Sequence, residues 1–257
     1  MISPPGSGLL IVNADDLGYD AAATDAILAA HAAGAITSAT AMVWMRDSER
    51  AGALARDSPL ALGLHLNLIE PYTAPDVPAA VAATQRRVVE RIHTAGSRAF
   101  AYHPGWASDF RRCIADQLAC FEQTYGQAPT HVDGHQHMHL LPNALFSGAL
   151  APVPRCRRPV NRPETESRPY KHALRDVQAA MVRLRFASTR WCFSIRALEP
   201  ALGGAGIEAG IGRAAADAVE IMVHPGWADE QTILLGDHWR AIVSGQRLGS
   251  FAELASR

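Results

Sequence analysis

The chain has 257 residues, of which 48% are hydrophobic and 19% are charged, and its formal net charge is −1 at pH 7. This composition is typical of a globular protein with a sizeable core. The near-zero charge argues against a nucleic-acid-binding protein, because such proteins usually carry a clear basic excess. We therefore expect a single domain over residues 1–257 with no nucleic-acid partner.

Two absences narrow the class of protein further. The first residues lack the basic and then apolar stretch of a signal peptide, and no apolar run approaches the roughly 18 residues of a membrane span. The four cysteines include no CxxC pair, which favours free thiols over disulfides. We expect a cytoplasmic protein without a membrane span, and we consider a homodimer as one assembly state.

Short apolar runs alternate with longer segments of helical periodicity along the chain. Strands are predicted over residues 9–12, 40–44, 60–68, 130–135, 190–195 and 219–223. Helices are predicted over residues 21–33, 48–56, 81–95, 109–125, 171–185, 237–244 and 250–256, with mostly loop over 71–78 and 151–170. Alternation of this kind predicts an α/β fold with mostly parallel strands, and a distorted (β/α) TIM-like barrel is favoured over an open doubly wound sheet.

The strongest chemical signal is a histidine-rich segment at the end of the fourth predicted strand. It reads His131-Val-Asp133-Gly-His135-Gln-His137-Met-His139, and residues two apart on an extended segment share a face. Histidine is a common metal ligand, so this density favours a metal site over a polar loop. One ion cannot take all four imidazoles, and His135, at the strand end, is our first choice of ligand.

A pair of adjacent carboxylates, Asp15 and Asp16, ends the first predicted strand and opens an acidic loop. Carboxylates beside an apolar strand are costly to bury without a partner, and a cation is a natural one. One of the two could bind metal while the other faces the substrate water. A helix N-cap or an exposed turn would also explain the pair.

Two more strands carry polar groups at their ends. His65 and Asn67 share one face of the leucine-rich third strand, and His224 ends the last strand before a Pro-Gly turn. In α/β barrels the active site gathers at the carboxyl ends of the strands. An imidazole that titrates near neutral pH suits a general acid, and we consider His224 for that role.

Two histidines and one carboxylate leave coordination positions open for water and substrate, as catalytic rather than structural sites do. We therefore predict one divalent ion held by two histidines and one of the two aspartates at the strand ends. The oxygen and nitrogen ligands are compatible with Zn²⁺ or Mg²⁺, and with Mn²⁺ or Co²⁺.

One short internal echo is visible. His103-Pro-Gly-Trp106 resembles His224-Pro-Gly-Trp227, but the flanking residues match at no fixed period. We interpret the echo as coincidence rather than as a repeat architecture.

Four motifs together resemble the YdjC-like carbohydrate deacetylases, a family that includes chitooligosaccharide and hopanoid-associated deacetylases. They occur in the family's order and are Asn13-Ala-Asp15-Asp16-Leu-Gly18, Gly63-Leu-His65-Leu-Asn67-Leu, His131-Val-Asp133-Gly-His135-Gln-His137 and Glu220-Ile-Met-Val-His224-Pro-Gly226. The chain departs from the family at Leu17, where Phe is usual.

The resemblance implies a distorted barrel that removes an acetyl group from an N-acetylated amino sugar. It implies Asp16, His65 and His135 as metal ligands, Asp15 as the general base and His224 as the general acid. An arginine after the histidine-rich motif is matched by Arg157 or Arg158, and with Asn67 these are our substrate-binding candidates.

Two other functions remain in competition at this point. A hydrolase of another bond, such as a phosphoester, could bind a second ion through Asp133, His137 or His139. A non-catalytic sugar-binding protein on the same scaffold would be expected to lack Asp15 or His224, and both are present.

Overall fold

The computed structural model describes residues 8–161, 169–198 and 206–255. Within these ranges six parallel strands form one sheet in the order β4-β3-β2-β1-β6-β5. The strands are β1 (Leu9–Leu17), β2 (Ser38–Ala41), β3 (Ala61–Leu66), β4 (Val132–Gly134), β5 (Trp191–Ser194) and β6 (Ala218–Val223).

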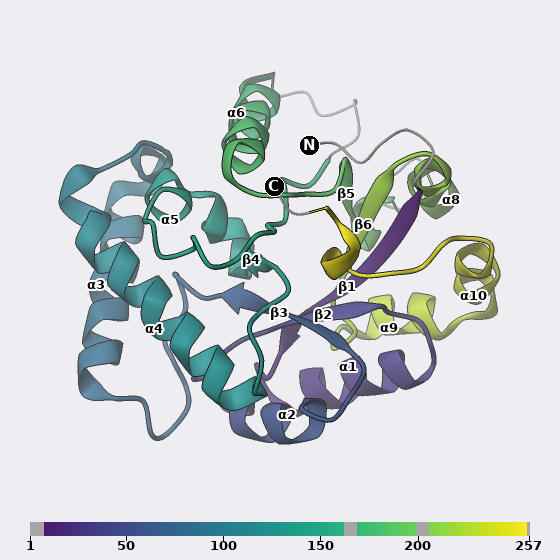
Figure 1. The fold of residues 1–257 in the computed structure, drawn as a ribbon, viewed down its shortest axis with the longest axis horizontal. Helices are drawn as coiled ribbons and strands as arrows, with labels where there is room; N and C mark the ends of the chain where they lie inside the picture. The colour runs from purple at the N-terminus through teal and green to yellow at the C-terminus, as the bar shows by residue number, and fades with distance from the viewer. Residues whose placement is uncertain (1–7, 162–168, 199–205, 256–257) are drawn as a thin grey trace.

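The sheet curls into a half-barrel with helices around it, so the predicted α/β, TIM-like fold is confirmed (Figure 1). Isolated parallel bridges pair Cys156 with Val132 of β4 and Arg155 with Ala187, four residues before β5. Residues 155–157 therefore span the gap between the two edge strands. This short connection brings Arg157 to the centre of the fold.

Helices cover the outside of the curled sheet, where α1 packs against β1, α4 against β3, and α3 against α4 (Figure 1). The longer helices are α1 (Ala21–Ala32), α2 (Ser48–Ala55), α3 (Ala79–Ala95), α4 (Ala107–Tyr125), α6 (Pro169–Arg185), α9 (Ala228–Leu235) and α10 (Asp237–Ser244). The shorter ones are α5 (Pro142–Leu145), α7 (Ile195–Leu198) and α8 (Ile207–Ile211), and 3₁₀ turns include η1 (Gly96–Phe100), η2 (Pro104–Trp106), η3 (His135–Leu140), η5 (Gly212–Ala215) and η6 (Phe251–Glu253).

Several predicted boundaries need correction. β1 continues through both aspartates to Leu17 instead of opening into a loop after Val12. β2 ends at Ala41, because Trp44 adopts a left-handed φ of 56° that an extended strand does not accommodate. The segment predicted as a closing helix over 250–256 forms the 3₁₀ turn η6, and residues 256–257 lie outside the described part of the chain.

The short helix α9 is absent from the sequence prediction. It begins immediately after the His224-Pro-Gly-Trp227 segment, with Asp229 and Glu230 in its first turn. Acidic residues in a first turn are a helix-start signal, because they interact favourably with the amino-terminal end of the helix dipole. The assignment of residues 1–257 to one domain stays a prediction.

Among the described helices, none combines the length and the apolar character needed to cross a membrane.

His131, the first histidine of the dense segment, is a core residue. Its side chain is fully buried and stacks on Phe251 with ring centroids 3.9 Å apart and planes 8° from parallel. Burial holds the pKa of His131 well below its ordinary value, so the ring is neutral near pH 7. Gly63 of β3 lies against this ring and leaves room for it.

We expect Gly63→Ala to destabilise the fold, because a Cβ at this position would overlap the His131 ring. Overpacking of this kind costs about 1–3 kcal/mol. Urea unfolding of both proteins measures the difference. Gly212→Ala is the matched control, because a Cβ there meets no atom within 4 Å. Equal losses of stability in the two variants would contradict the packing argument.

Candidate metal centre

The side chains of Asp15 and Asp16 point into different surroundings, because the pairing of β1 is irregular near its carboxyl end. The register of β1 against β2 shifts between Ala14 and Leu17, and Asp16 has a φ of 73°, which is uncommon for a residue with a side chain. Asp15 is 3% exposed, whereas Asp16 is half-buried. The backbone kink thus separates a deep carboxylate from an accessible one.

Asp16, His65 and His135, predicted to share an ion, do come together. The carboxylate oxygen Oδ1 of Asp16 lies 3.3 Å from Nε2 of His65 and 3.0 Å from Nδ1 of His135. One potential ligand atom from each residue lies within 4.8 Å of the others. Their role as metal ligands stays a prediction, but the spatial condition for it is met.

The surroundings of this trio suit a divalent cation. Nδ1 of His65 is 2.7 Å from Oδ1 of Asp133, which leaves Nε2 directed at Asp16. A carboxylate behind a ligating imidazole fixes its tautomer and raises its basicity. Burial raises the pKa of Asp16, but hydrogen bonds from His135 and His65 outweigh it and hold that pKa well below the ordinary value. An ionised carboxylate and two oriented imidazoles are therefore available together.

Glu70 is a neighbour of the trio that the sequence analysis missed. Its Oε1 atom lies 3.1 Å from Nε2 of His135. Asn67 builds the turn that carries Glu70: its Oδ1 accepts from the Ile69 and Glu70 amides, and its Nδ2 donates to the Glu70 carbonyl. Asn67 is fully buried with its amide used in this way. These bonds give Asn67 a part in positioning Glu70, and its contact with a substrate stays a prediction.

Next to the trio, three carboxylates surround the side chain of Arg157, which is fully buried; we call this set the lower cluster. The Arg157 guanidinium reaches Asp15 at 2.6 and 2.7 Å, Asp133 at 2.7 Å and Glu220 at 2.7 Å. Burial raises the pKa of Asp15, but Arg157 and His65 outweigh it and hold that pKa well below the ordinary value. A buried carboxylate set needs such a partner, because unpaired buried charges are strongly destabilising.

The guanidinium occupies the position that a second cation would need. Asp15, His65 and Asp133 also satisfy the spacing of a metal-binding group. However, the Nη1 atom of Arg157 lies between the Asp15 and Asp133 carboxylates, 2.6 and 2.7 Å from them. The fixed positive charge of this side chain therefore favours one ion at the upper trio over two ions.

The two candidate substrate arginines point in different directions. Arg157 turns inward, and its backbone is held by Val132 and by His139, whose Nε2 lies 3.2 Å from the Arg157 carbonyl oxygen. Arg158 donates to the Arg190 carbonyl and lines a separate cavity of about 340 Å³ with Arg183 and others. Substrate binding by either arginine stays a prediction: the guanidinium of Arg157 is fully buried and bonded, and Arg158 lines the separate cavity.

His224 follows β6 and is held by Glu230 of α9. The His224 amide donates to Oε2 of Glu230 at 2.5 Å, and Nδ1 of the ring lies 3.5 Å from Oε1. Burial lowers the pKa of His224, but the interactions with Glu230 and then with Asp15 outweigh it and raise that pKa above the ordinary value. The imidazole is thus suited to carry a proton near neutral pH.

His137 and His139, the remaining members of the histidine-rich segment, belong to no group with metal-binding spacing among the described residues. His139 is fully buried against the Arg157 carbonyl. His137 has a left-handed φ of 60°, and burial with the nearby Arg157 charge lowers its pKa to about 4. Together with the bonded state of Asp133, these placements count against the two-ion alternative.

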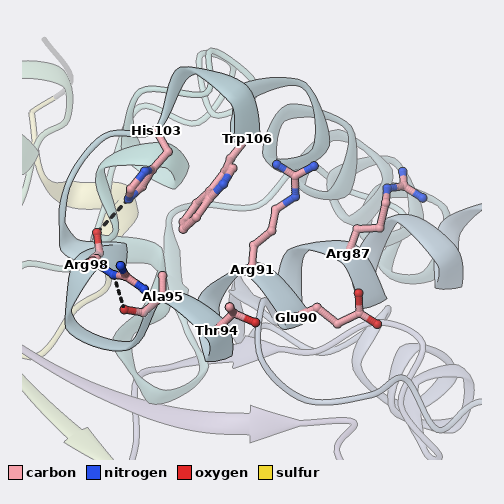
Figure 2. A pocket seen from close by; sticks show the side chains of 8 residues that line it. All are labelled: Arg87, Glu90, Arg91, Thr94, Ala95, Arg98, His103 and Trp106. Carbon is pink, nitrogen blue, oxygen red and sulfur yellow. Dashed lines mark hydrogen bonds between the residues drawn. The ribbon is translucent and has the colours of Figure 1, made fainter.

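The echoed segment at His103 lies in another hollow, between α3 and the start of α4 (Figure 2). Here Arg87 and Arg91 are already paired with Asp109, and Nε2 of His103 lies 2.8 Å from the Arg98 carbonyl oxygen. None of the residues lining this hollow belongs to the trio or to the lower cluster. The sequence echo therefore marks a similar turn in two places and no second copy of the centre.

We expect Asp133→Asn to weaken Zn²⁺ binding about 10–100-fold, because it removes the anionic partner of His65 Nδ1. Isothermal titration with Zn²⁺ measures the affinity, and circular dichroism checks the fold. Asp237→Asn is the matched control, because its side chain is 98% exposed and remote from the trio. Unchanged affinity in a folded Asp133→Asn protein would contradict the proposed orientation of His65.

Glu220 generates a pH-dependent prediction. Burial, partly offset by Arg157, raises its pKa from 4.5 to about 7. When a carboxyl group has a higher pKa in the folded than in the unfolded state, the protein loses stability as pH rises from the unfolded-state pKa to the folded-state pKa. We expect Glu220→Gln to become less destabilising relative to the parent from pH 5 to pH 8, by up to about 3 kcal/mol. Chemical denaturation at both pH values measures this; a pH-independent difference would contradict the assignment.

Comparison with known proteins places these observations in a family. The family model of the YdjC-like proteins matches residues 9–256. The chain is 38% identical over 146 residues to a human carbohydrate deacetylase, covering 55% of this chain and 45% of that protein. It is 35% identical over 168 residues to a carbohydrate deacetylase of Geobacillus stearothermophilus, covering 65% and 64%.

A chitooligosaccharide deacetylase of Serratia marcescens is 31% identical over 137 residues, covering 52% of this chain and 51% of that protein. The chain thus spans between about half and two thirds of the length of these curated relatives. A crystal structure of an Enterococcus faecalis V583 protein named for cellobiose-phosphate cleavage matches the fold with a TM-score of 0.69 at 20% identity, covering 95% of this chain and 98% of that one. By the match over nearly its whole length, the chain belongs to the YdjC-like protein family.

Proposed function

We propose that this chain is a metal-dependent hydrolase that removes the acetyl group from an N-acetylated amino sugar. The observation that carries the proposal is the convergence of Asp16, His65 and His135 beside a buried carboxylate and a proton-bearing imidazole. The names of the relatives supply the substrate class: carbohydrate deacetylase and chitooligosaccharide deacetylase.

Asp16, His65 and His135 would hold the cation. When bound, a divalent cation polarises the amide carbonyl and lowers the pKa of water toward neutrality. Two imidazole nitrogens beside one carboxylate favour Zn²⁺ over Mg²⁺, with Mn²⁺ and Co²⁺ also compatible.

Asp15 is proposed as the general base. Its carboxylate stays ionised near neutral pH because Arg157 binds both of its oxygens. The same two bonds fix its orientation, while Asn13 donates to Oδ1 at 3.0 Å. Asp15 would accept a proton from the attacking water, and Arg157 would hold the carboxylate in place.

His224 is proposed as the general acid. An amine is a poor leaving group unless it receives a proton as the carbon–nitrogen bond breaks. The raised pKa of His224 keeps a proton on the ring near neutral pH, and because the Glu230 carboxylate lies on the Nδ1 side, 3.5 Å away, Nε2 would be the donor. His224 would deliver that proton to the sugar nitrogen.

The alternatives are less well supported. Phosphoester hydrolysis with two ions would need ligands that Arg157 and His65 already engage in the described residues. A non-catalytic sugar-binding protein would not need both Asp15 and His224, and both residues are present. The cytoplasmic location and the homodimer stay predictions from the sequence.

The proposed activity is tested by acetate release from N,N′-diacetylchitobiose, with the purified chain loaded with Zn²⁺, Mn²⁺, Co²⁺ or Mg²⁺ in turn. We expect Asp15→Asn and His224→Gln each to lower kcat about 10²–10⁴-fold, because each removes one proton-transfer group. His238→Gln, at a side chain 70% exposed on α10, is the control and should keep full activity.

The same assay gives a pH test of His224. Because a general acid must be protonated, kcat should fall as pH rises above the raised pKa of His224, and Gln in its place should remove that fall. A metal-loaded protein that releases no acetate from any N-acetylated amino sugar would remove the deacetylase assignment.

A further inference from the structure

The His224-Pro-Gly-Trp227 turn folds its tryptophan back over its histidine. The Trp227 amide donates to the His224 carbonyl at 2.9 Å. The two rings lie 4.2 Å apart between centroids, with planes only 7° from parallel. The indole therefore covers one face of the imidazole.

The turn itself is anchored against helix α1. A Cβ on Gly226 would lie 3.3 Å from the Cα atom of Ala23, so the backbone approaches the helix as closely as glycine allows. Pro225 beside it is buried. The turn that carries the tryptophan is thus packed against α1 at Gly226.

The indole has a second partner, Arg196 of α7. Its guanidinium carbon lies over the ring, 5.1 Å from the centroid, and its Nη1 atom is 3.1 Å from Oδ2 of Asp229 in α9. A guanidinium over an indole is a favourable cation–π arrangement. Arg196 therefore ties the tryptophan to the helix that also supplies Glu230.

We propose that Trp227, secured by Arg196, is a positioning residue that holds the imidazole of His224 in the orientation needed for proton delivery; this rests on the proposed function of His224. Oε1 of Glu230 lies 3.5 Å from Nδ1 of the ring, and the stacked indole restricts rotation of the ring plane. Although Trp227 is 45% exposed, its assigned role is to position His224 and not to stack on a sugar ring.

The chain contains its own matched control. His103-Pro-Gly-Trp106 makes a similar stack, with centroids 3.9 Å apart and planes 22° from parallel (Figure 2). The Trp106 amide donates to the His103 carbonyl at 3.0 Å. That pair lines the hollow beside α3, whose lining includes no residue of the candidate centre. Removing either indole removes the same local contact, but only one of them touches the proposed acid.

The test compares Trp227→Leu with Trp106→Leu in the full chain. Nitrogen-detected NMR titration follows the His224 and His103 rings, and kcat and KM are measured for N,N′-diacetylchitobiose with Zn²⁺. The groups that act on His224 are Glu230, Asp15, Asp16 and, through the indole, Arg196, and the NMR variants leave all of these in place.

We expect Trp227→Leu to lower kcat about tenfold with KM unchanged, and to lower the measured pKa of His224 by about 0.5, because an imidazolium loses a stacked π face. Trp227→Phe should restore most of both values. Trp106→Leu should shift only His103. Arg196→Met, at a side chain 43% exposed, should give a smaller loss of kcat without disturbing the core.

A folded Trp227→Leu protein with the parental His224 titration and kcat would overturn the proposal, as would equal losses from Trp106→Leu. If the parent itself releases no acetate, the proposed activity fails, and the NMR comparison alone decides whether Trp227 holds His224.

Discussion

The structure depends on one buried guanidinium. Arg157 sits where three strand-borne carboxylates, Asp15, Asp133 and Glu220, converge at the centre of the curled sheet. Three buried carboxylates without a cation would repel one another and lack solvation, and removing one partner of a buried pair costs about 3–5 kcal/mol. The residue lies on the short 155–157 connection, whose isolated bridges pair it with β4 and with residue 187 before β5.

That arrangement separates two kinds of site. Below, the charges are balanced inside the protein, and the geometry is fixed by bonds of 2.6–2.7 Å. Above, Asp16 is turned out of the cluster by its left-handed backbone and meets His65 and His135 at an accessible position. Asp133 connects the two levels, because it bonds both Arg157 and the rear nitrogen of His65. This division supports our proposal of a single accessible cation position at the trio.

Much of this could be predicted from sequence, because strand ends in a parallel barrel meet at one face. The alternation of runs predicted the barrel, the dense histidines and the aspartate pair predicted a metal site, and the family resemblance implied the trio. The sequence could not predict the direction in which individual side chains point. Nothing in the string Arg157-Arg158 says which guanidinium turns inward, since that depends on bridges to Val132 and Ala187, distant in sequence. Likewise Asn67 reads as a pocket residue, and its use in the Glu70 turn emerges only in three dimensions. Glu220 was not singled out from the sequence, although a charge within an apolar strand indicates a buried partner.

The central claim is that one cation binds at Asp16, His65 and His135 because Arg157 already fills the lower cluster. Anomalous diffraction at the zinc edge from crystals grown with Zn²⁺ tests it most directly. The account predicts a single strong peak within coordinating distance of Asp16, His65 and His135, with the guanidinium of Arg157 still between Asp15 and Asp133. A second peak at Asp15 and Asp133 with Arg157 displaced, or a lone peak away from the trio, would contradict it.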